Sequence, residues 1–194
     1  ISWIYPFVEL LTAALWSVVA LAAIAQGGGI PELITGAVFV TILVPIAMID
    51  LQLRIIPDEL NYVAIWAGFA CSLGFGPRPR FVADELWWLE VLLASAGVAI
   101  FLLLPSLITR GRGMGMGDVK LAVALGAFLG APVAVGMFVG FLVALVPSVV
   151  LIARRGVARG RKSAIPFGPF LAIGGVFGWF YGTQLLDLYL STGT

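Results

Sequence analysis

The longest uncharged stretch of the chain, residues 121–153, sets the first limit on the fold. It holds 33 residues without a charge, whereas one crossing of a bilayer needs about 20 apolar residues. Proline disfavours continued helix and restricts the residue before it, so Gly130-Ala131-Pro132 is expected to divide the stretch. We therefore predict a short helix over about 119–129 and a full-length helix over about 132–153.

The composition of the chain excludes a soluble globular domain. Of the 194 residues, 61% are hydrophobic and only 11% are charged, whereas soluble domains carry about 25% charged residues. The single cysteine, Cys71, excludes a disulfide framework and a cysteine-ligated metal site. Since the chain has no histidine, Ser-His chemistry and histidine metal ligation are excluded as well. Membrane lipid, and not nucleic acid, is the expected surrounding partner.

Five further apolar segments bring the expected number of hydrophobic helices to seven. They extend over about 7–25, 33–49, 60–75, 89–108 and 165–186. Trp87, Trp88 and Glu90 precede or begin the fourth of these helices, and we expect them at the membrane interface. The predicted fold class is an all-α polytopic membrane bundle, with residues 1–194 forming a single membrane-embedded domain.

Glycines recur at four-residue spacing within the last three predicted helices. Small residues on one helix stripe let two helices approach closely in lipid. We interpret this pattern as helix packing and assign it no chemistry; the glycines are Gly126, Gly130, Gly136, Gly140, Gly174, Gly178 and Gly182.

The distribution of basic residues predicts the orientation in the membrane. With seven helices, the segments that follow helices two, four and six lie on one side together with the N-terminus. That side holds nine of the eleven basic residues, including those of the loop 154–162. By the positive-inside rule it is the cytoplasmic side.

Two short polar stretches on that side carry the candidate chemistry. The first, residues 49–60, contains Asp50, which ends an apolar run. The second, residues 113–121, contains Gly115-Met116-Gly117-Asp118. Carboxylates bordering a membrane segment are costly to hold and mark functional sites. Two neighbouring carboxylates share a proton, so one can take a proton from water while the other donates to a substrate carbonyl. Glycine at 115 and 117 lets an extended substrate backbone approach Asp118 closely.

Each aspartate also has a purely structural interpretation. Asp118 is suited to be the N-cap of a helix that starts at Val119, a role compatible with catalysis. Asp50 could reach water at the membrane border or pair with Arg54. The occurrence of both on one side, each in its motif, favours the catalytic interpretation.

Asp58 and Glu59, which follow Pro57, are typical of a helix start. We interpret them first in that way. Their negative charge is also suited to attract a basic segment of a substrate, so they are secondary substrate-binding candidates together with Gly115 and Gly117.

The motifs resemble those of the type IV prepilin peptidases, membrane aspartic proteases of the GxGD type. The resemblance is carried by Gly115-x-Gly117-Asp118 with Val119-Lys120-Leu121, and by Ile49-Asp50 with Ile56-Pro57-Asp58. Further similarity lies in Tyr5-Pro6 near the start and in Ile165-Pro166-Phe167-Gly168-Pro169-Phe170 before the last helix.

The resemblance implies that Asp50 and Asp118 are the catalytic pair of a protease in the bacterial inner membrane, facing the cytoplasm. Its expected substrates are type IV prepilins and type II secretion pseudopilins, cut after a glycine that ends a basic leader. No cofactor is expected for peptidase activity. Bifunctional members also N-methylate the new amino terminus with S-adenosylmethionine, and they carry a cysteine-bearing N-terminal cytoplasmic region that this chain lacks. We therefore expect methyltransferase activity only from a full-length parent protein, not from this chain.

Two other classes remain as alternatives. A presenilin-like or signal-peptide-peptidase-like protease shares GxGD, but it is expected to have Tyr-Asp at the first aspartate, where Ile49 precedes Asp50 here. A proton-coupled transporter is expected to place its carboxylates at mid-membrane in broken helices. Cleavage of a co-expressed prepilin would separate these readings. The sequence does not indicate an oligomeric state.

Overall fold

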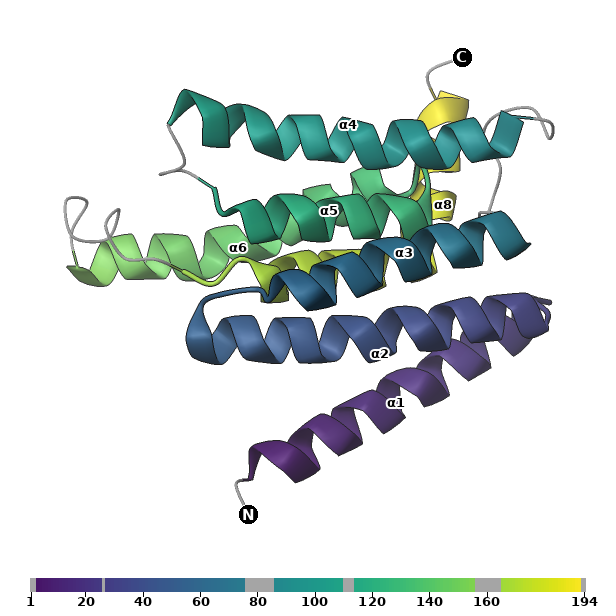
Figure 1. The fold of residues 1–194 in the computed structure, drawn as a ribbon, viewed down its shortest axis with the longest axis horizontal. Coiled ribbons are helices and arrows are strands. Elements are labelled where there is room, and N and C mark those ends of the chain that lie inside the picture. Colours follow the sequence, from purple (N-terminus) through teal and green to yellow (C-terminus); the bar gives the residue numbers. More distant parts are fainter. Residues whose placement is uncertain (1–2, 26, 76–85, 110–113, 156–164, 193–194) are drawn as a thin grey trace.

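A computed structural model describes residues 3–25, 27–75, 86–109, 114–155 and 165–192, and the described residues form seven helices. With the labels of Figure 1, these helices are α1 (Ile4–Ala25), α2 (Ile30–Leu53), α3 (Asp58–Phe75), α4 (Trp87–Ile108), α5 (Met116–Leu129), α6 (Val133–Arg155) and α8 (Gly168–Thr192). The chain is therefore an all-α bundle, as the sequence predicts.

Each predicted segment corresponds to one helix, although most helices extend beyond the predicted ends. Two of these differences bear on the candidate site. Helix α2 continues to Leu53, so Asp50 lies inside the helix instead of after it. Helix α5 begins at Met116, so the predicted start at Val119 is wrong by three residues. The extra turn forms because Gly115 takes an extended conformation and serves as the N-cap.

Four of the helices are long and apolar enough to cross a membrane by length and composition: α1, α2, α4 and α6. The prediction of about seven hydrophobic helices, one of them short, is therefore slightly overstated. Helix α5 has only 14 residues, and polar residues and glycine make up a larger share of α3 and α8 than of the four candidate spans. The protein is nevertheless an integral membrane protein by the number and apolar character of its helices.

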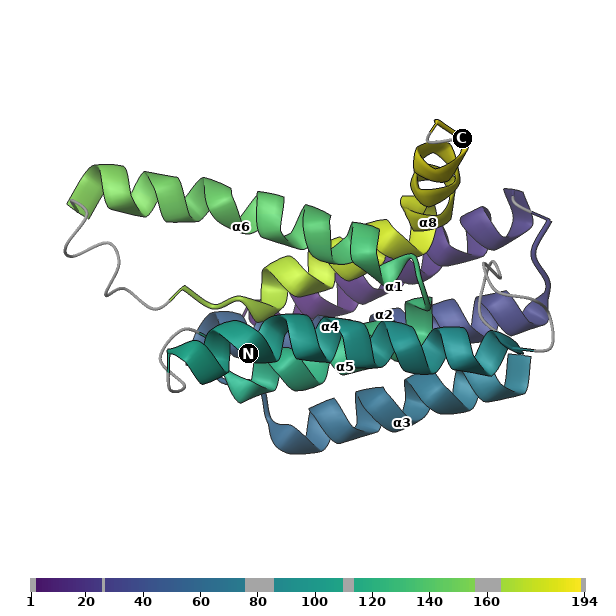
Figure 2. The same ribbon diagram turned by 90° about the horizontal axis from the view of Figure 1, so that it is seen from above.

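Helix α5 lies at the centre of the bundle (Figures 1 and 2). It packs against α3 and α4 and also contacts α8, while α2 packs against α3 and α8. Helix α1 packs mainly along α2 at the periphery. Helix α6 packs mainly along α8, and Figure 2 shows its C-terminal part extending away from the other helices.

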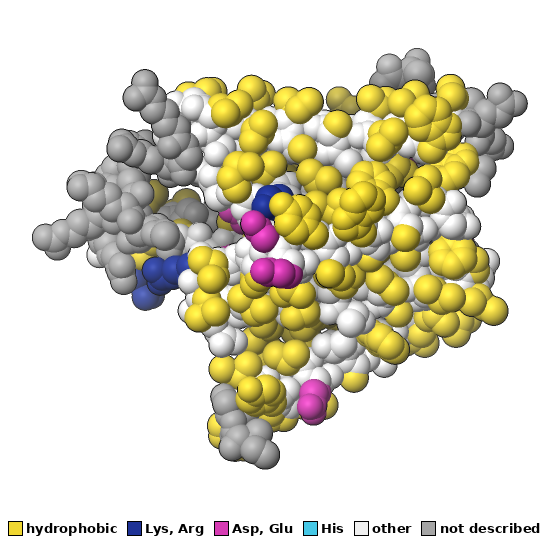
Figure 3. Space-filling view, in the orientation of Figure 1, with side chains coloured by type: hydrophobic (Ala, Val, Ile, Leu, Met, Phe, Trp, Pro, Cys, Tyr) yellow, Lys and Arg dark blue, Asp and Glu magenta, His cyan; other side chains and the backbone are white. Residues whose placement is uncertain are grey.

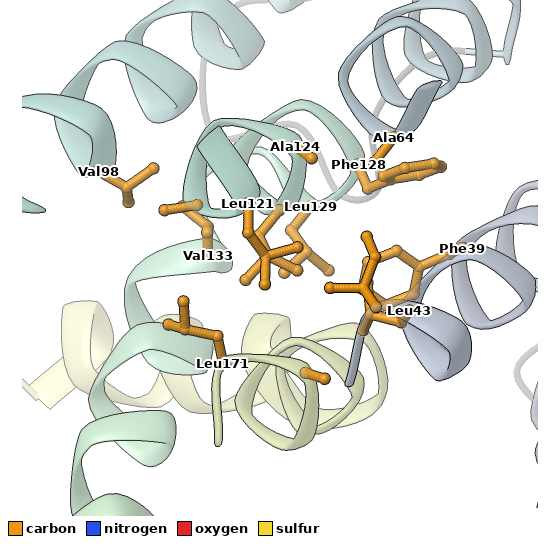
Figure 4. Close-up of a cluster of buried hydrophobic side chains, with 14 of the residues drawn as sticks. Phe39, Leu43, Ala64, Val98, Leu121, Ala124, Phe128, Leu129, Val133 and Leu171 are labelled. Carbon is orange, nitrogen blue, oxygen red and sulfur yellow. The ribbon is translucent and has the colours of Figure 1, made fainter. Parts of the chain in front are cut away.

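The hydrophobic core surrounds α5 because this helix is apolar on nearly all sides. Leu121 and Leu125 are at most 1% exposed, and Phe128 is 3% exposed. The ring centroids of Phe128 and Phe39 of α2 lie 5.0 Å apart. Figure 4 shows Leu121 and Leu129 facing Leu171 of α8 across this core. A helix without a polar face is expected to be buried on all sides, as α5 is.

The regularly spaced glycines form close helix contacts, which confirms the packing interpretation. A methyl group added at Gly136 of α6 would lie 2.8 Å from the Gly174 carbonyl oxygen of α8. One added at Gly140 would lie 2.9 Å from the Phe170 carbonyl oxygen. In α5, a methyl group at Gly126 would lie 2.6 Å from the Cα atom of Ser95 in α4. Any larger residue at these positions would push the paired helices apart.

Glu90, which the sequence predicts at the membrane interface, turns its side chain into the protein. Its side chain is buried, with 4% exposed, and its Oε1 atom accepts the backbone N–H of Ala131 at 3.2 Å. Ala131 lies in the turn between α5 and α6, next to Gly130, whose φ is 63°. The carboxylate thus satisfies a backbone donor in an irregular turn, where a lost hydrogen bond would be costly.

One end of the bundle collects the polar motifs. The C-terminal ends of α2, α4 and α6 lie there with the N-terminal ends of α3, α5 and α8, on the left in Figure 1. This grouping matches the side that the sequence assigns to Asp50 and Asp118. The loop 154–162 and the segment 110–112 contain further basic residues that the sequence assigns to this side. Both fall largely outside the described residues.

Candidate active site

Asp50 lies in the last turn of α2, and its side chain is 4% exposed. Its Oδ2 atom accepts the backbone N–H of Gly168 at 2.8 Å. Arg54 follows as the C-cap of α2 in a left-handed conformation, and its N–H donates to the Asp50 backbone carbonyl at 2.9 Å. The structural interpretation of Asp50 predicted a carboxylate that reaches water at the membrane border or pairs with Arg54. The carboxylate instead is buried and binds the backbone of Gly168.

The partner of Asp50 is the N-terminal end of α8. Gly168 is the first residue of this helix, where backbone N–H groups have no intrahelical acceptor and the helix dipole favours negative charge. Space for the carboxylate depends on the glycine. A methyl group at Gly168 would lie 2.8 Å from the Asp50 Oδ2 atom and 3.2 Å from its Cβ atom. The local arrangement thus fixes the orientation of Asp50.

Asp118 is the third residue of α5, whose N-cap is Gly115. The prediction that Asp118 is itself the N-cap is therefore wrong. Its carboxylate instead turns back and accepts the backbone N–H of Gly115. A methyl group at Gly115 would lie 3.1 Å from the Asp118 Oδ2 atom, so glycine leaves room for this contact. Asp118, like Asp50, is held against the N-terminal end of a helix.

The two carboxyl groups interact with each other. Asp118 lies outside the four candidate membrane spans, and its pKa is raised to about 6. Burial is the largest cause, the charge of Asp50 adds to it, and the hydrogen bond from Gly115 acts in the opposite direction. Burial and a neighbouring carboxylate both favour the neutral form of a carboxyl group. Acid–base hydrolysis needs one neutral and one ionised carboxyl group, and this environment of Asp118 is compatible with that requirement.

Contacts between α3 and α5 connect the two polar stretches. Gly117 lies against the residues before α3: a methyl group there would be 3.1 Å from the Cβ atom of Ile56. The Nδ2 atom of Asn61 in α3 donates to the Gly117 carbonyl at 3.2 Å. From the other side, the Ser106 hydroxyl of α4 donates to the Met114 carbonyl at 3.2 Å. The turn that carries Asp118 is thus held from two neighbouring helices.

Asp58 and Glu59 occupy the first turn of α3, as predicted, and both are exposed. Asp58 forms an ion pair of 2.7 Å with Lys120, two residues after Asp118. The Lys120 Nζ atom also donates to the Tyr62 hydroxyl at 3.2 Å. In Figure 3 acidic and basic side chains meet on a face that is otherwise largely hydrophobic. Of the four secondary candidates, Gly115 and Gly117 adjoin Asp118 directly, whereas the two acidic residues lie on the surface beside it.

Three residues of this region were not singled out from the sequence as site residues: Gly168, Asn61 and Ser106. Gly168 acts through its backbone N–H, for which side-chain chemistry gives no signal. Asn61 follows Asp58 and Glu59 at the polar start of α3, so it did not stand out as a separate signal in the sequence. Within the described residues, no group of three histidine, cysteine or acidic side chains is arranged as a metal site.

Comparison with protein families gives one match over most of the chain. The model of the type IV leader peptidase family matches residues 37–158, which include both aspartates and the residues that hold Asp118. Comparison with solved structures finds no match.

Individual relatives are similar over nearly the whole chain. The prepilin leader peptidase/N-methyltransferase of Aeromonas salmonicida is 35% identical over 99% of this chain and 63% of its own length. The proteins of the same name from Bacillus subtilis and Neisseria gonorrhoeae are 30% and 36% identical. They are covered over 71% and 57% of their lengths, with 98% and 90% of this chain aligned. The chain thus spans about three fifths of the Aeromonas relative.

Proposed function

Because this chain belongs to the type IV leader peptidase family, we propose that it is a membrane aspartic endopeptidase acting on type IV prepilins and type II secretion pseudopilins. The cleavage that we propose removes a short basic leader, after a glycine, at the membrane border. The catalytic residues in this proposal are Asp50 and Asp118.

The observation that carries the proposal is the pairing of these two carboxyl groups. They come from the end of α2 and the start of α5, and the bundle brings them close enough for the charge of Asp50 to raise the pKa of Asp118. Both are held by backbone N–H groups at helix N-termini, which offsets part of their repulsion. A purely structural pair gives no reason to place two carboxyl groups together at such a cost.

In the proposed reaction the pair carries one proton. The ionised carboxylate takes a proton from water, the water oxygen attacks the scissile carbonyl carbon, and the neutral carboxyl donates its proton to the carbonyl oxygen. The tetrahedral intermediate then collapses as the C–N bond breaks. The leaving nitrogen receives the proton that the first carboxylate took from water, and a hydroxyl group of the intermediate returns a proton to the second carboxylate. No covalent bond forms between enzyme and substrate.

The glycines beside Asp118 support an extended substrate at this point. A helix hides its carbonyls in hydrogen bonds, so the substrate must be locally extended to be cut. Gly115 is exposed, and Gly117 is partly exposed. These positions leave the carboxyl accessible to a peptide backbone, and a glycine before the scissile bond adds no side chain on the substrate.

The grouping of basic residues supports a cytoplasmic location of the site in the bacterial inner membrane. Arg54 and Lys120 lie at the end of the bundle that holds the aspartates. By the positive-inside rule this end faces the cytoplasm, where the basic leader of a prepilin also stays. Glu59 has an exposed carboxylate that can attract such a leader, whereas the charge of Asp58 is partly balanced by Lys120.

The proposal is confined to the peptidase activity. The names of the relatives also include N-methyltransferase, and for this protein we connect that activity, with its S-adenosylmethionine, only to a longer parent chain. The comparisons favour leader peptidases over the presenilin-like and transporter alternatives. The position of both aspartates at helix ends also argues against a transporter with mid-membrane carboxylates.

The test is co-expression with a prepilin, with cleavage followed by the mobility of the pilin on a gel. Asp50→Asn and Asp118→Asn should each lower cleavage by more than about 10²-fold, because asparagine keeps the shape but cannot exchange the proton. Asp58→Asn is the matched control at the same end of the bundle and should keep substantial activity. Near wild-type cleavage by Asp118→Asn would refute the aspartic mechanism.

A further inference from the structure

The turn that presents Asp118 is held by two side chains to which the proposed chemistry gives no role. Asn61 of α3 donates to the Gly117 carbonyl at 3.2 Å, and Ser106 of α4 donates to the Met114 carbonyl at 3.2 Å. Asn61 is fully buried, and Ser106 is 5% exposed. We propose that Asn61 and Ser106 are positioning residues that fix the Asp118 turn relative to Asp50. This inference rests on the proposed peptidase function.

The hydrogen bond from Asn61 is not needed to satisfy the backbone. The Gly117 carbonyl lies in the first turn of α5, where carbonyl groups already accept an N–H from the next turn of the helix. Asn61 therefore donates a second hydrogen bond to a carbonyl group that already accepts one from the helix backbone. The bond holds the peptide group between Gly117 and Asp118, and the orientation of that peptide decides where the Asp118 side chain points.

The side chain of Asn61 also contains a buried oxygen atom that lacks a hydrogen-bond donor. Its Oδ1 atom is buried and has no hydrogen-bond partner among the described residues. Leaving a buried carbonyl oxygen unpaired is unfavourable, so an apolar side chain would suit this place in the core better. Residues that break a local rule of stability occur mainly where function requires them. The unpaired Oδ1 atom is therefore the sign that the Nδ2 donor serves the site.

The surroundings make the position of the turn sensitive to this contact. Gly117 already touches Ile56, with 3.1 Å between the Ile56 Cβ atom and a methyl group placed at 117. Without the donor of Asn61, the contacts of the first turn of α5 with the α3 side that are described above are this apolar contact and those of the Lys120 side chain with Asp58 and Tyr62. Neither of them holds the Gly117 peptide group. A displacement of about 1 Å in a catalytic group can lower the rate about 10²-fold.

The chain offers a matched control on the same pair of helices. The Ser72 hydroxyl of α3 donates to the Ala127 carbonyl of α5, and Ser72 is 2% exposed. This hydrogen bond also joins a buried α3 side chain to an α5 carbonyl, but at the end of α5 away from Asp118. Ser72→Ala thus weakens the packing of α3 on α5 and leaves the Asp118 turn untouched.

The experiment compares kcat, KM and the thermal midpoint of purified wild type, Asn61→Leu, Asn61→Ala, Ser106→Ala and Ser72→Ala with a prepilin substrate. We expect kcat to fall at least about 10-fold in both Asn61 variants and about 3-fold or more in Ser106→Ala. KM should stay within about 2-fold, because the substrate surface is unchanged. Asn61→Leu should melt no lower than wild type, since it removes the unpaired carbonyl.

The outcomes separate this inference from the proposed function. If wild type cleaves and a folded Asn61 variant keeps wild-type kcat, the positioning role is refuted. If Ser72→Ala loses as much kcat as the Asn61 variants, the loss reflects helix packing and the inference also fails. If neither Asn61 variant folds, unchanged kcat in Ser106→Ala refutes the positioning role. A fall in kcat in Ser106→Ala with KM unchanged supports that role. A wild-type protein that does not cleave prepilin would instead overturn the proposed function.

Discussion

A single methyl group at position 168 should disturb catalysis without touching either aspartate chemically. Gly168 donates its backbone N–H to the Asp50 Oδ2 atom at 2.8 Å and begins α8. Its substitution by alanine places a Cβ atom 2.8 Å from that same oxygen and 3.2 Å from the Asp50 Cβ and Cγ atoms. Alanine is a good helix residue, so the conflict lies in the available space and not in the backbone conformation.

The expected size of the effect follows from these distances. Ordinary van der Waals contact begins at 3.4 Å, so the carboxyl oxygen, the helix start or both must move by about 0.6 Å. Asp50 is 4% exposed and has little free space in which to rotate. Because a misplacement of about 1 Å costs about 10²-fold in rate, we expect Gly168→Ala to lower kcat about 10-fold.

The assay is the rate of prepilin cleavage by purified protein in detergent, with the thermal midpoint measured in parallel. Gly97→Ala in α4 is the matched control, because a methyl group there has no neighbouring atom within 4 Å. The control should keep wild-type kcat. Wild-type kcat in Gly168→Ala would show that the contact between α8 and Asp50 does not set the catalytic geometry.

Three further predictions concern stability and topology. The folded pKa of Asp118 near 6 lies above the value of about 3.9 in an unfolded chain, so the folded protein binds more protons between these values. Its thermal midpoint in detergent should therefore fall as pH rises from about 4 to about 6, and Asp118→Asn should flatten this dependence. Gly174→Ala should lower the unfolding free energy by about 1–3 kcal/mol, measured by denaturant titration, because its methyl group would overlap the Gly136 carbonyl oxygen of α6 and lie 2.8 Å from the Gly140 nitrogen. In a Cys71→Ala background, a polar thiol reagent should label Ile55→Cys only from the cytoplasmic side and Ile30→Cys only from outside; the reverse labelling would contradict the proposed orientation.

The helices and the aspartate pair could be predicted from the sequence because both leave one-dimensional signals. Long apolar runs mark the helices, and the glycines around Asp118 mark the second aspartate motif. The ends of the helices were less predictable. Asp50 was expected to stop α2, since a carboxylate at the membrane border normally faces water. The helix continues because α8, distant in the chain, supplies a hydrogen-bond donor at that point.

The residues that hold the site were harder to find, for a physical reason. Gly168 contributes a backbone N–H, which every residue except proline possesses, so only the fold shows that this one matters. Asn61 contributes a side-chain donor to a residue far along the chain, and sequence alone does not pair them. Glu90 stands beside two tryptophans, which predicted an interfacial position, yet its carboxylate turns inward to Ala131.

The shortness of α5 explains why these polar side chains surround it. A helix of 14 residues is about 21 Å long, whereas the apolar layer of a bilayer is about 30 Å thick. At least one end of α5 must therefore lie within the apolar layer, where water does not satisfy irregular backbone. Both ends receive side-chain partners from neighbouring helices: Asn61 and Ser106 at the start, and Glu90 just beyond the end. A full-length helix in this place would carry Asp118 to the membrane surface, away from Asp50 near the end of α2. The short helix and its polar supports are thus two parts of one arrangement, which in the proposed function holds a carboxyl pair at the level where a substrate helix leaves the bilayer.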